Sequence, residues 1–152
     1  MLLDALDHAI LQVVQRDNQI THEALGARVG LSPSSCRRRL AALRKAGVIV
    51  ADVAIVDPGK IGLNITLHVL VTLDRDAAEA HRAFRAIVAT APEVLSCHYV
   101  TGPADYLATI CVASMAEYEA MSDRLFSGSP VQRVETMVEM RCVKRATMHS
   151  AV

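Results

Sequence analysis

A cluster of basic side chains offers the clearest chemistry in this sequence. It lies within THEALGARVGLSPSSCRRRLAALRKAG, residues 21–47, and comprises Arg37, Arg38, Arg39, Arg44 and Lys45. A rigid cationic helix can enter a groove of double-stranded DNA, where arginine donates two hydrogen bonds to guanine. The segment therefore predicts a DNA-binding helix-turn-helix. The alternative interpretation is a charged helix face that only meets solvent.

Local signals predict the helices that would position this cluster. Thr21 is a helix cap and Gly30 a helix end, while Ser32 followed by Pro33 starts the next helix, which Gly47 ends. At about 100° per residue, that helix turns Cys36, Leu40 and Leu43 inward. The opposite face is expected to carry Ser34, Arg38, Ala41 and Lys45, flanked by Arg37 and Arg44 on one side and Ser35 and Arg39 on the other.

Each of these side chains has an expected contact with DNA. Arg37 and Arg38 are predicted to reach bases or phosphates, and Arg39 and Arg44 to hold the DNA backbone. At the start of the helix, hydroxyl and N–H groups are expected to meet phosphate. The residues concerned are Ser32, Ser34 and Ser35.

The charge distribution agrees with a two-part chain. The 152 residues have a formal net charge of zero, but residues 1–48 hold seven basic and four acidic residues, a balance of +3, so the remainder carries −3. We expect a winged helix-turn-helix domain over 1–57, a linker over 58–63 and a second domain over 64–152. A first helix is predicted from Asp4 to Gln15, with Asp4 as its cap. β-Branched residues over 48–56 predict a short two-stranded ribbon, the wing.

The second half changes to a mixed pattern. Strands are predicted over 65–73, 94–101, 105–113 and 131–144, and helices over 77–91 and 115–126. The order β-α-β-β-α-β predicts a ferredoxin-like sheet with both helices on one face, so the fold class is α+β. The other sheet face is expected to be bare and apolar, which favours a homodimer.

Several functional classes are disfavoured. No run of about 18 apolar residues predicts a membrane span, and the amino terminus has acids where a signal peptide needs positive charge. We therefore expect a cytoplasmic protein without a membrane partner. Cys97 and His98 are neighbours on a predicted strand and point to opposite faces, so no metal site and no cofactor are predicted.

An enzyme is the second hypothesis, because ferredoxin-like folds host small-molecule chemistry and Asp105, His98 and Tyr99 would form its site. However, the sequence contains no Ser/His/Asp, H-E-x-x-H, phosphate-loop or paired-carboxylate motif. We therefore predict that the protein is not an enzyme.

Four blocks, in order, resemble the Lrp/AsnC family, the feast/famine transcriptional regulators of bacteria and archaea. They are LDHAILQVVQRDNQIT, ALGARVGLSPSSCRRRLAALRKAGVI, HYVTGPADYLATICV and VETMVEMRCVK. The resemblance implies an amino-terminal winged helix-turn-helix and a ferredoxin-like regulatory domain. It also implies pairing through the regulatory sheets, further assembly to octamers or similar, and binding of a free amino acid between dimers.

The resemblance places an effector site at the loop TGPADY and the last strand. Asp105 would accept from the ammonium group, and backbone N–H groups near Gly102 and the hydroxyl of Thr136 would donate to the carboxylate, beside Tyr106. The alternative is a structural hairpin in which Asp105 holds the turn and Tyr106 fills the core. Some family positions differ here: Val134 replaces a hydroxyl residue, Met137 stands where aromatics occur, and Pro103 removes a loop N–H. Leucine is thereby disfavoured, and another effector, or none, remains open.

Two regulatory interpretations fit the whole sequence. One is a sequence-specific transcriptional regulator modulated by a small molecule such as an amino acid. The other is an architectural DNA-organising protein without an effector, in which multimers wrap DNA through many weak contacts.

Overall fold

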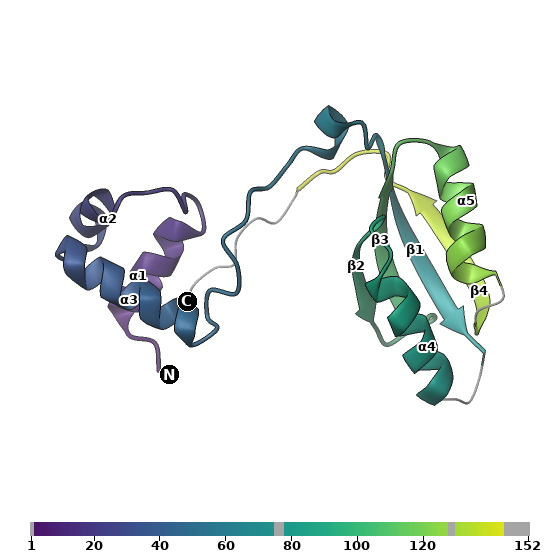
Figure 1. Ribbon diagram of the computed structural model, residues 1–152, viewed down its shortest axis with the longest axis horizontal. Helices are drawn as coiled ribbons and strands as arrows, with labels where there is room; N and C mark the ends of the chain where they lie inside the picture. Colours follow the sequence, from purple (N-terminus) through teal and green to yellow (C-terminus); the bar gives the residue numbers. More distant parts are fainter. Residues whose placement is uncertain (1, 75–77, 128–129, 145–152) are drawn as a thin grey trace. The chain divides into compact units, whose positions relative to one another are not determined.

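A computed structural model describes residues 2–74, 78–127 and 130–144 of the chain. The described residues divide into two compact units, one formed by 2–55 together with 143–144 and the other by Val56–Cys142 (Figure 1). The first unit is helical. The second contains a four-stranded sheet with two helices, and the two units are described separately below.

Three helices form the first unit, and side-chain caps start each of them. Helix α1 spans Ala5–Val14, α2 spans His22–Val29 and α3 spans Pro33–Lys45, with Asp4, Thr21 and Ser32 as their N-caps. Gly30 ends α2 in the left-handed conformation, at φ 73°. These starts and ends agree with the sequence prediction, because capping depends on residues that are close in the chain.

A small aliphatic core joins the three helices. It contains Ile10, Leu11, Leu25, Cys36, Leu40 and Leu43, all at most 9% exposed. Gly26 lies on α2 where the chain turns back, and a Cβ added there would meet the carbonyl oxygen of Leu31 at 2.4 Å. Only glycine allows α2 and the turn to approach this closely.

The wing predicted over 48–56 is not formed as a ribbon. Residues 50–57, all of which the structure describes, belong to no strand or helix. Val50, Val53 and Ile55 are 90%, 68% and 65% exposed, so these three apolar side chains add little to the core of the first unit. The prediction of a two-stranded ribbon here is wrong because a short isolated strand pair gains too little from pairing alone. A 3-10 turn, η1, then spans Pro58–Ile61.

The second unit has the predicted β-α-β-β-α-β order. Its strands are β1 (Ile65–Leu73), β2 (Val94–Tyr99), β3 (Tyr106–Val112) and β4 (Val131–Val138), and its helices are α4 (Ala78–Ala89) and α5 (Met115–Phe126). The sheet order is β2-β3-β1-β4, with every pair antiparallel. This arrangement confirms the predicted ferredoxin-like sheet (Figure 1). Ala77, the predicted start of the first helix, lies outside the described residues.

Both helices cover the same face of the sheet. Leu67, Val69 and Val71 of β1 are fully buried in one cluster with Phe84 of α4 and Met121 of α5. Alternation along a strand makes every second residue face the helices. The core of this unit therefore lies between the sheet and the helix layer.

The opposite sheet face is mixed, not the apolar surface that the sequence predicted. By alternation it carries Thr66, His68, Leu70 and Thr72 of β1, all half-buried. His68 Nε2 lies 3.1 Å from Oε2 of Glu139, and its Nδ1 lies 3.4 Å from the hydroxyl of Thr109. Polar and ionisable groups thus share this face with leucines.

Strand β4 is also shorter than predicted. The sequence favoured a strand through residue 144, but β4 ends at Val138, which pairs with Leu67. One more backbone bond joins Glu139 N–H to the carbonyl of Thr66, close to the start of β1. The strand stops because its neighbour begins there, and no sequence signal within residues 139–144 marks that limit.

Candidate functional site

The exposure of α3 follows the expected helical pattern. Cys36, Leu40 and Leu43 are buried, and the opposite face of Ser34, Arg38, Ala41 and Lys45 is exposed. The helix is amphipathic, so its core side fixes which side chains face outward. One side of α3 therefore presents a strip of small and cationic residues.

The three serines gather at the start of α3. Ser32 Oγ accepts a hydrogen bond of 3.2 Å from the backbone N–H of Ser35. The same hydroxyl lies 3.1 Å from Ser34 Oγ and donates to Ser35 Oγ at 2.9 Å. The cluster is solvent-facing and sits at a helix N-terminus, where the helix dipole favours an anion such as phosphate.

The four arginines of α3 fall into two pairs with different surroundings. Arg37 and Arg38 are exposed, and neither forms an ion pair within the described part of the chain. Arg44 instead binds Asp52 in two places, Nε to Oδ2 at 2.8 Å and Nη2 to Oδ1 at 3.2 Å. That hydrogen bonding raises the pKa of Arg44 and lowers the pKa of Asp52.

Arg39 is held even more closely. Its Nη1 donates to Oδ2 of Asp4 and to Oδ1 of Asp7, each at 2.8 Å. The side chain is 26% exposed, and hydrogen bonds to Asp7 and then Asp4 raise its pKa. Neither acid was singled out as a functional residue in the sequence, where Asp4 was only a helix cap.

The loop before β3 is tied into the sheet. Asp105 Oδ2 accepts a 2.8 Å hydrogen bond from the backbone N–H of Leu73, and the N–H of Asp105 donates to the carbonyl of Val71 at 3.0 Å. Gly102 is exposed and has φ 126°, a conformation that glycine adopts readily. These contacts give Asp105 the turn-holding role that the sequence left as one of two alternatives.

Tyr106 lies in the core beside that loop. It is 2% exposed, and its hydroxyl is 2.9 Å from His81 Nδ1. Its ring packs on Phe84, with centroids 4.7 Å apart. Burial raises the pKa of the Tyr106 phenol. Its ring also lines part of a cavity of about 390 Å³ between α4 and β2, together with Arg85, Val88 and Cys97.

Thr136 stands apart from Asp105 within one chain. It pairs with Val69 on the far side of β1, whereas Asp105 binds Leu73, four residues further along that strand. Four residues of strand span about 13 Å. The structure therefore brings Asp105 and Tyr106 together at one end of β3, but not Thr136.

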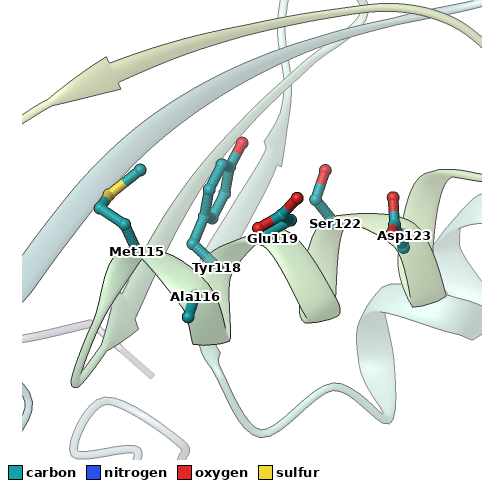
Figure 2. A pocket seen from close by; sticks show the side chains of 6 residues that line it. All are labelled: Met115, Ala116, Tyr118, Glu119, Ser122 and Asp123. Atoms are coloured by element: carbon teal, nitrogen blue, oxygen red, sulfur yellow. The ribbon is translucent and has the colours of Figure 1, made fainter.

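Thr136 instead contacts α5. Its hydroxyl forms a hydrogen bond with the hydroxyl of Tyr118. Figure 2 shows Tyr118 on one face of α5. This side chain lines a hollow of about 440 Å³. The hollow is lined by Met115, Ala116, Tyr118, Glu119, Ser122 and Asp123. The sequence does not predict the hydrogen bond between Thr136 and Tyr118, because the spacing of Tyr118 in its helix is that of an ordinary core residue.

Among the residues that the structure describes, no group of three or more His, Cys, Asp or Glu side chains is placed to hold a metal ion. Within the same residues, no helix is both long and apolar enough to cross a membrane.

Comparison with known proteins identifies the family. A model of the Lrp/AsnC ligand binding domain matches residues 66–148, and one of a winged helix-turn-helix DNA-binding domain matches residues 3–50. The chain belongs to the Lrp/AsnC family of transcriptional regulators. The resemblance inferred from four sequence blocks is therefore confirmed, as is the two-part fold class.

Relatives align over almost the whole chain. An uncharacterized HTH-type transcriptional regulator, y4tD, of Sinorhizobium fredii is 41% identical, covering 95% of this chain and 86% of that protein. The DNA-binding transcriptional activator DecR of Escherichia coli is 33% identical, covering 96% and 97%. The crystal structure of the regulator NMB0573–L-Met complex from Neisseria meningitidis has a TM-score of 0.92 at 35% identity, covering 97% and 96%.

These matches make the chain an Lrp/AsnC-type DNA-binding transcriptional regulator with a ligand-binding domain. They do not test individual site residues. The predicted DNA contacts of Ser32, Ser34, Ser35, Arg37, Arg38, Arg39 and Arg44 stay predictions, as do the effector contacts of Gly102, Asp105, Tyr106 and Thr136.

Proposed function

We propose that this Lrp/AsnC regulator recognises specific double-stranded DNA with the outer face of α3, in the cytoplasm. The observation that carries the proposal is that Arg37 and Arg38 are exposed and form no ion pair within the described residues. Arg38 lies on the face of α3 opposite its core, and Arg37 lies on the flank of that face. Unpaired guanidinium groups reach base edges or phosphates without first breaking an internal contact. Ser32, Ser34 and Ser35 would meet a phosphate at the helix start.

The test compares two DNA duplexes at the same salt concentration. One carries the region upstream of the protein's own gene, and the other is a random sequence of equal length and composition. We expect tighter binding of the upstream fragment, and Arg38→Gln to weaken it by about 1–3 kcal/mol. Arg82→Gln, which removes an exposed cation from α4, is the matched control and should change binding little. Equal binding of both duplexes by the wild-type protein would rule out a sequence-specific regulator.

The second domain is proposed to bind a free amino acid. Support comes from the related NMB0573 structure, which is a complex with L-Met, and from the match to a ligand-binding domain. The proposed contacts are Gly102, Asp105, Tyr106 and Thr136. Because Thr136 is separated from Asp105 along β1, a ligand touching both would need residues from more than one copy of the chain.

A thermal-shift screen of the twenty amino acids tests the effector. A ligand that binds only the folded protein raises its melting temperature by mass action. We expect at least one amino acid to raise it, and no shift with any of them would contradict the proposal. The family gives no reason to expect catalysis, so incubation with amino acids should yield no product.

We propose that copies of the chain assemble through the second domain. We propose domain limits of 1–57, 58–63 and 64–152, with the second domain joining copies of the chain into a homodimer and then an octamer or similar. The mixed sheet face with His68 and Glu139 offers polar and apolar groups for such pairing. Light scattering on the eluting protein measures the mass, and a monomer at all concentrations would contradict this assembly.

The second candidate is an architectural DNA-organising protein without an effector. The net charge of zero for the whole chain argues against it, since wrapping long DNA relies on many nonspecific cationic contacts. Footprinting separates the two. Protection that repeats every helical turn over long stretches would favour the architectural protein, and a single short palindrome would favour the specific regulator.

A further inference from the structure

Asp7 is a buried acid beside the apolar core of the first unit. Its side chain is 8% exposed, yet no core position of α1 requires a charge. Burying a carboxylate is unfavourable unless it is paired and hydrogen-bonded. Both oxygens of Asp7 are satisfied: Oδ1 accepts from Arg39 at 2.8 Å, and Oδ2 accepts from the backbone N–H of Asp4 at 3.2 Å.

Asp4 mirrors this arrangement. Its Oδ1 accepts a 2.8 Å hydrogen bond from the N–H of Asp7, which completes a reciprocal capping box at the start of α1. Its Oδ2 accepts from Nη1 of Arg39 at 2.8 Å. One guanidinium nitrogen, with its two hydrogens, thus bridges the two carboxylates of the capping box. We refer to Asp4, Asp7 and Arg39 as the acid clamp.

The acid clamp joins the first turn of α1 to the middle of α3. Arg39 lies on the flank of α3, one residue before the buried Leu40, and only 26% of its side chain is exposed. The hydrophobic contacts between the helices, such as Ile10 with the Leu40 cluster, are not directional. Hydrogen bonds to two fixed carboxylates are directional, so they define how α3 is rotated and tilted against α1.

The neighbours of Arg39 in the sequence give this geometry a functional consequence. Arg37 and Arg38 precede it on the same helix turn and carry the proposed DNA contacts. A rotation of α3 about its axis would move their guanidinium groups away from the groove. Recognition of a base edge is sensitive to such a shift because its hydrogen bonds need both distance and direction.

We propose that Arg39 is a positioning residue for DNA recognition, held by Asp4 and Asp7, and not itself a DNA contact. This inference rests on the proposed function. For Arg39 Nη1 to bind a phosphate, it would have to leave Asp7 as a buried carboxylate without its cation, and breaking one partner of a buried pair is strongly unfavourable. The same clamp makes Asp4 and Asp7 contributors to DNA binding although both carry negative charge.

The sign of the charge change gives a discriminating test. Arg39→Gln removes a cation and Asp7→Asn removes an anion, so simple attraction to DNA predicts opposite effects. The acid clamp predicts that both weaken binding of the upstream fragment, each by about tenfold, and that the double variant loses little more than either single variant. Glu23→Gln, at an exposed acid of α2, is the matched control, and its affinity should equal or slightly exceed that of the wild type.

Salt dependence on the random duplex provides a second readout. Each phosphate contact contributes about −0.9 to the slope of log affinity against log salt concentration. Arg38→Gln should make the slope shallower, whereas Arg39→Gln should leave it close to the wild-type value. Arg39→Lys keeps the charge but not the bridging geometry, so it should weaken specific binding as Arg39→Gln does. Circular dichroism of each full-length variant checks that it is folded.

The outcomes separate the two proposals. If wild-type protein binds the two duplexes equally, the proposed specific recognition fails, and the clamp fails with it as a device for that recognition. A different result overturns only the inference about the acid clamp. In that result the wild type is specific, Asp7→Asn binds the upstream fragment at least as tightly as the wild type, and Arg39→Gln both weakens binding and makes the salt slope shallower. Arg39 would then be a DNA contact.

Discussion

The backbone N–H of Leu73 donates a 2.8 Å hydrogen bond to Oδ2 of Asp105, across the end of two neighbouring strands. The bond fixes the loop before β3 to the last residue of β1. It also occupies one oxygen of the side chain that we propose as an acceptor for an amino acid's ammonium group. The other oxygen remains for a ligand, so one carboxylate can serve both structure and binding.

The structural role of Asp105 predicts that its replacement lowers the free energy of unfolding even when no ligand is present. Asp105→Ala leaves the N–H of Leu73 without its acceptor, which should lower the free energy of unfolding by about 1–3 kcal/mol. Asp105→Asn keeps a carbonyl oxygen in the same place and should lower it less. Urea unfolding without amino acids measures both.

Asp74→Asn is the control for this comparison. Asp74 is the next residue along the chain and is exposed, and its carboxylate forms no hydrogen bond or ion pair in the described part of the chain. Its replacement should change the unfolding free energy by less than about 0.5 kcal/mol. If Asp105→Ala were as stable as the wild type, the hydrogen bond to Leu73 would not hold the loop.

The turn between α2 and α3 predicts a second effect. Gly26→Ala would put a Cβ 2.4 Å from the carbonyl oxygen of Leu31, a backbone atom that cannot move without shifting the turn. Overpacking of this kind costs about 1–3 kcal/mol, and we expect α3 to be displaced as well. Thermal unfolding and binding to the upstream fragment should both be impaired.

Gly59→Ala serves as the matched glycine control. A Cβ at Gly59 would lie 3.5 Å from Oδ1 of Asp57, an ordinary contact, and its φ is not positive. This substitution should be neutral or slightly stabilising, because alanine restricts the unfolded chain more than glycine does. A Gly26→Ala protein that melts and binds DNA like the Gly59→Ala protein would contradict the proposed close approach.

Much of the fold follows from signals between residues close in the chain. Asp4, Thr21 and Ser32 cap helices as predicted, because each side chain accepts from an N–H three residues later. The alternation of buried residues along β1 likewise marks its two faces. Such local patterns decide element type and approximate limits without tertiary information.

The features that sequence reasoning missed depend on distant residues. Arg39 and Asp7 are 32 positions apart, as are Asp105 and Leu73, so no spacing rule connects either pair. The end of β4 depends on where β1 begins. Four adjacent or nearby arginines also look equivalent in the sequence, although carboxylates hold Arg39 and Arg44 and leave Arg37 and Arg38 exposed. Charge pairing across a fold decides which cations are available.

Because the chain has two compact units, each with its own core, we expect them to unfold in separate transitions. Leu43 is fully buried in the core of the first unit, and Leu43→Ala should cost about 2–5 kcal/mol there. In calorimetry of full-length Leu43→Ala, the helical unit should unfold at a lower temperature than in the wild type. The unfolding temperature of the sheet unit should not change. Val50→Ala, at a side chain that is 90% exposed, should leave both transitions in place. Equal shifts of both transitions would show that the units unfold together.

The ion pair between Arg44 and Asp52 predicts a dependence on pH. The hydrogen bond from Arg44 holds the pKa of Asp52 below its ordinary value of about 3.9. A carboxyl group with a lower pKa in the folded state stabilises the fold above its unfolded pKa, and this contribution disappears as the pH falls through the folded pKa. The melting temperature of Asp52→Asn should therefore lie below that of the wild type at neutral pH, and the two should converge below about pH 4.

The difference at neutral pH should be small, because the two side chains are 43% and 44% exposed and solvent screens their attraction. Added salt should reduce it further. Glu23→Gln removes an exposed acid that forms no ion pair within the described residues, so its melting temperature should lie close to that of the wild type at neutral pH. A gap between Asp52→Asn and the wild type that widens on acidification would have the wrong sign for this pair and would show that Asp52 is not stabilised by Arg44 in solution.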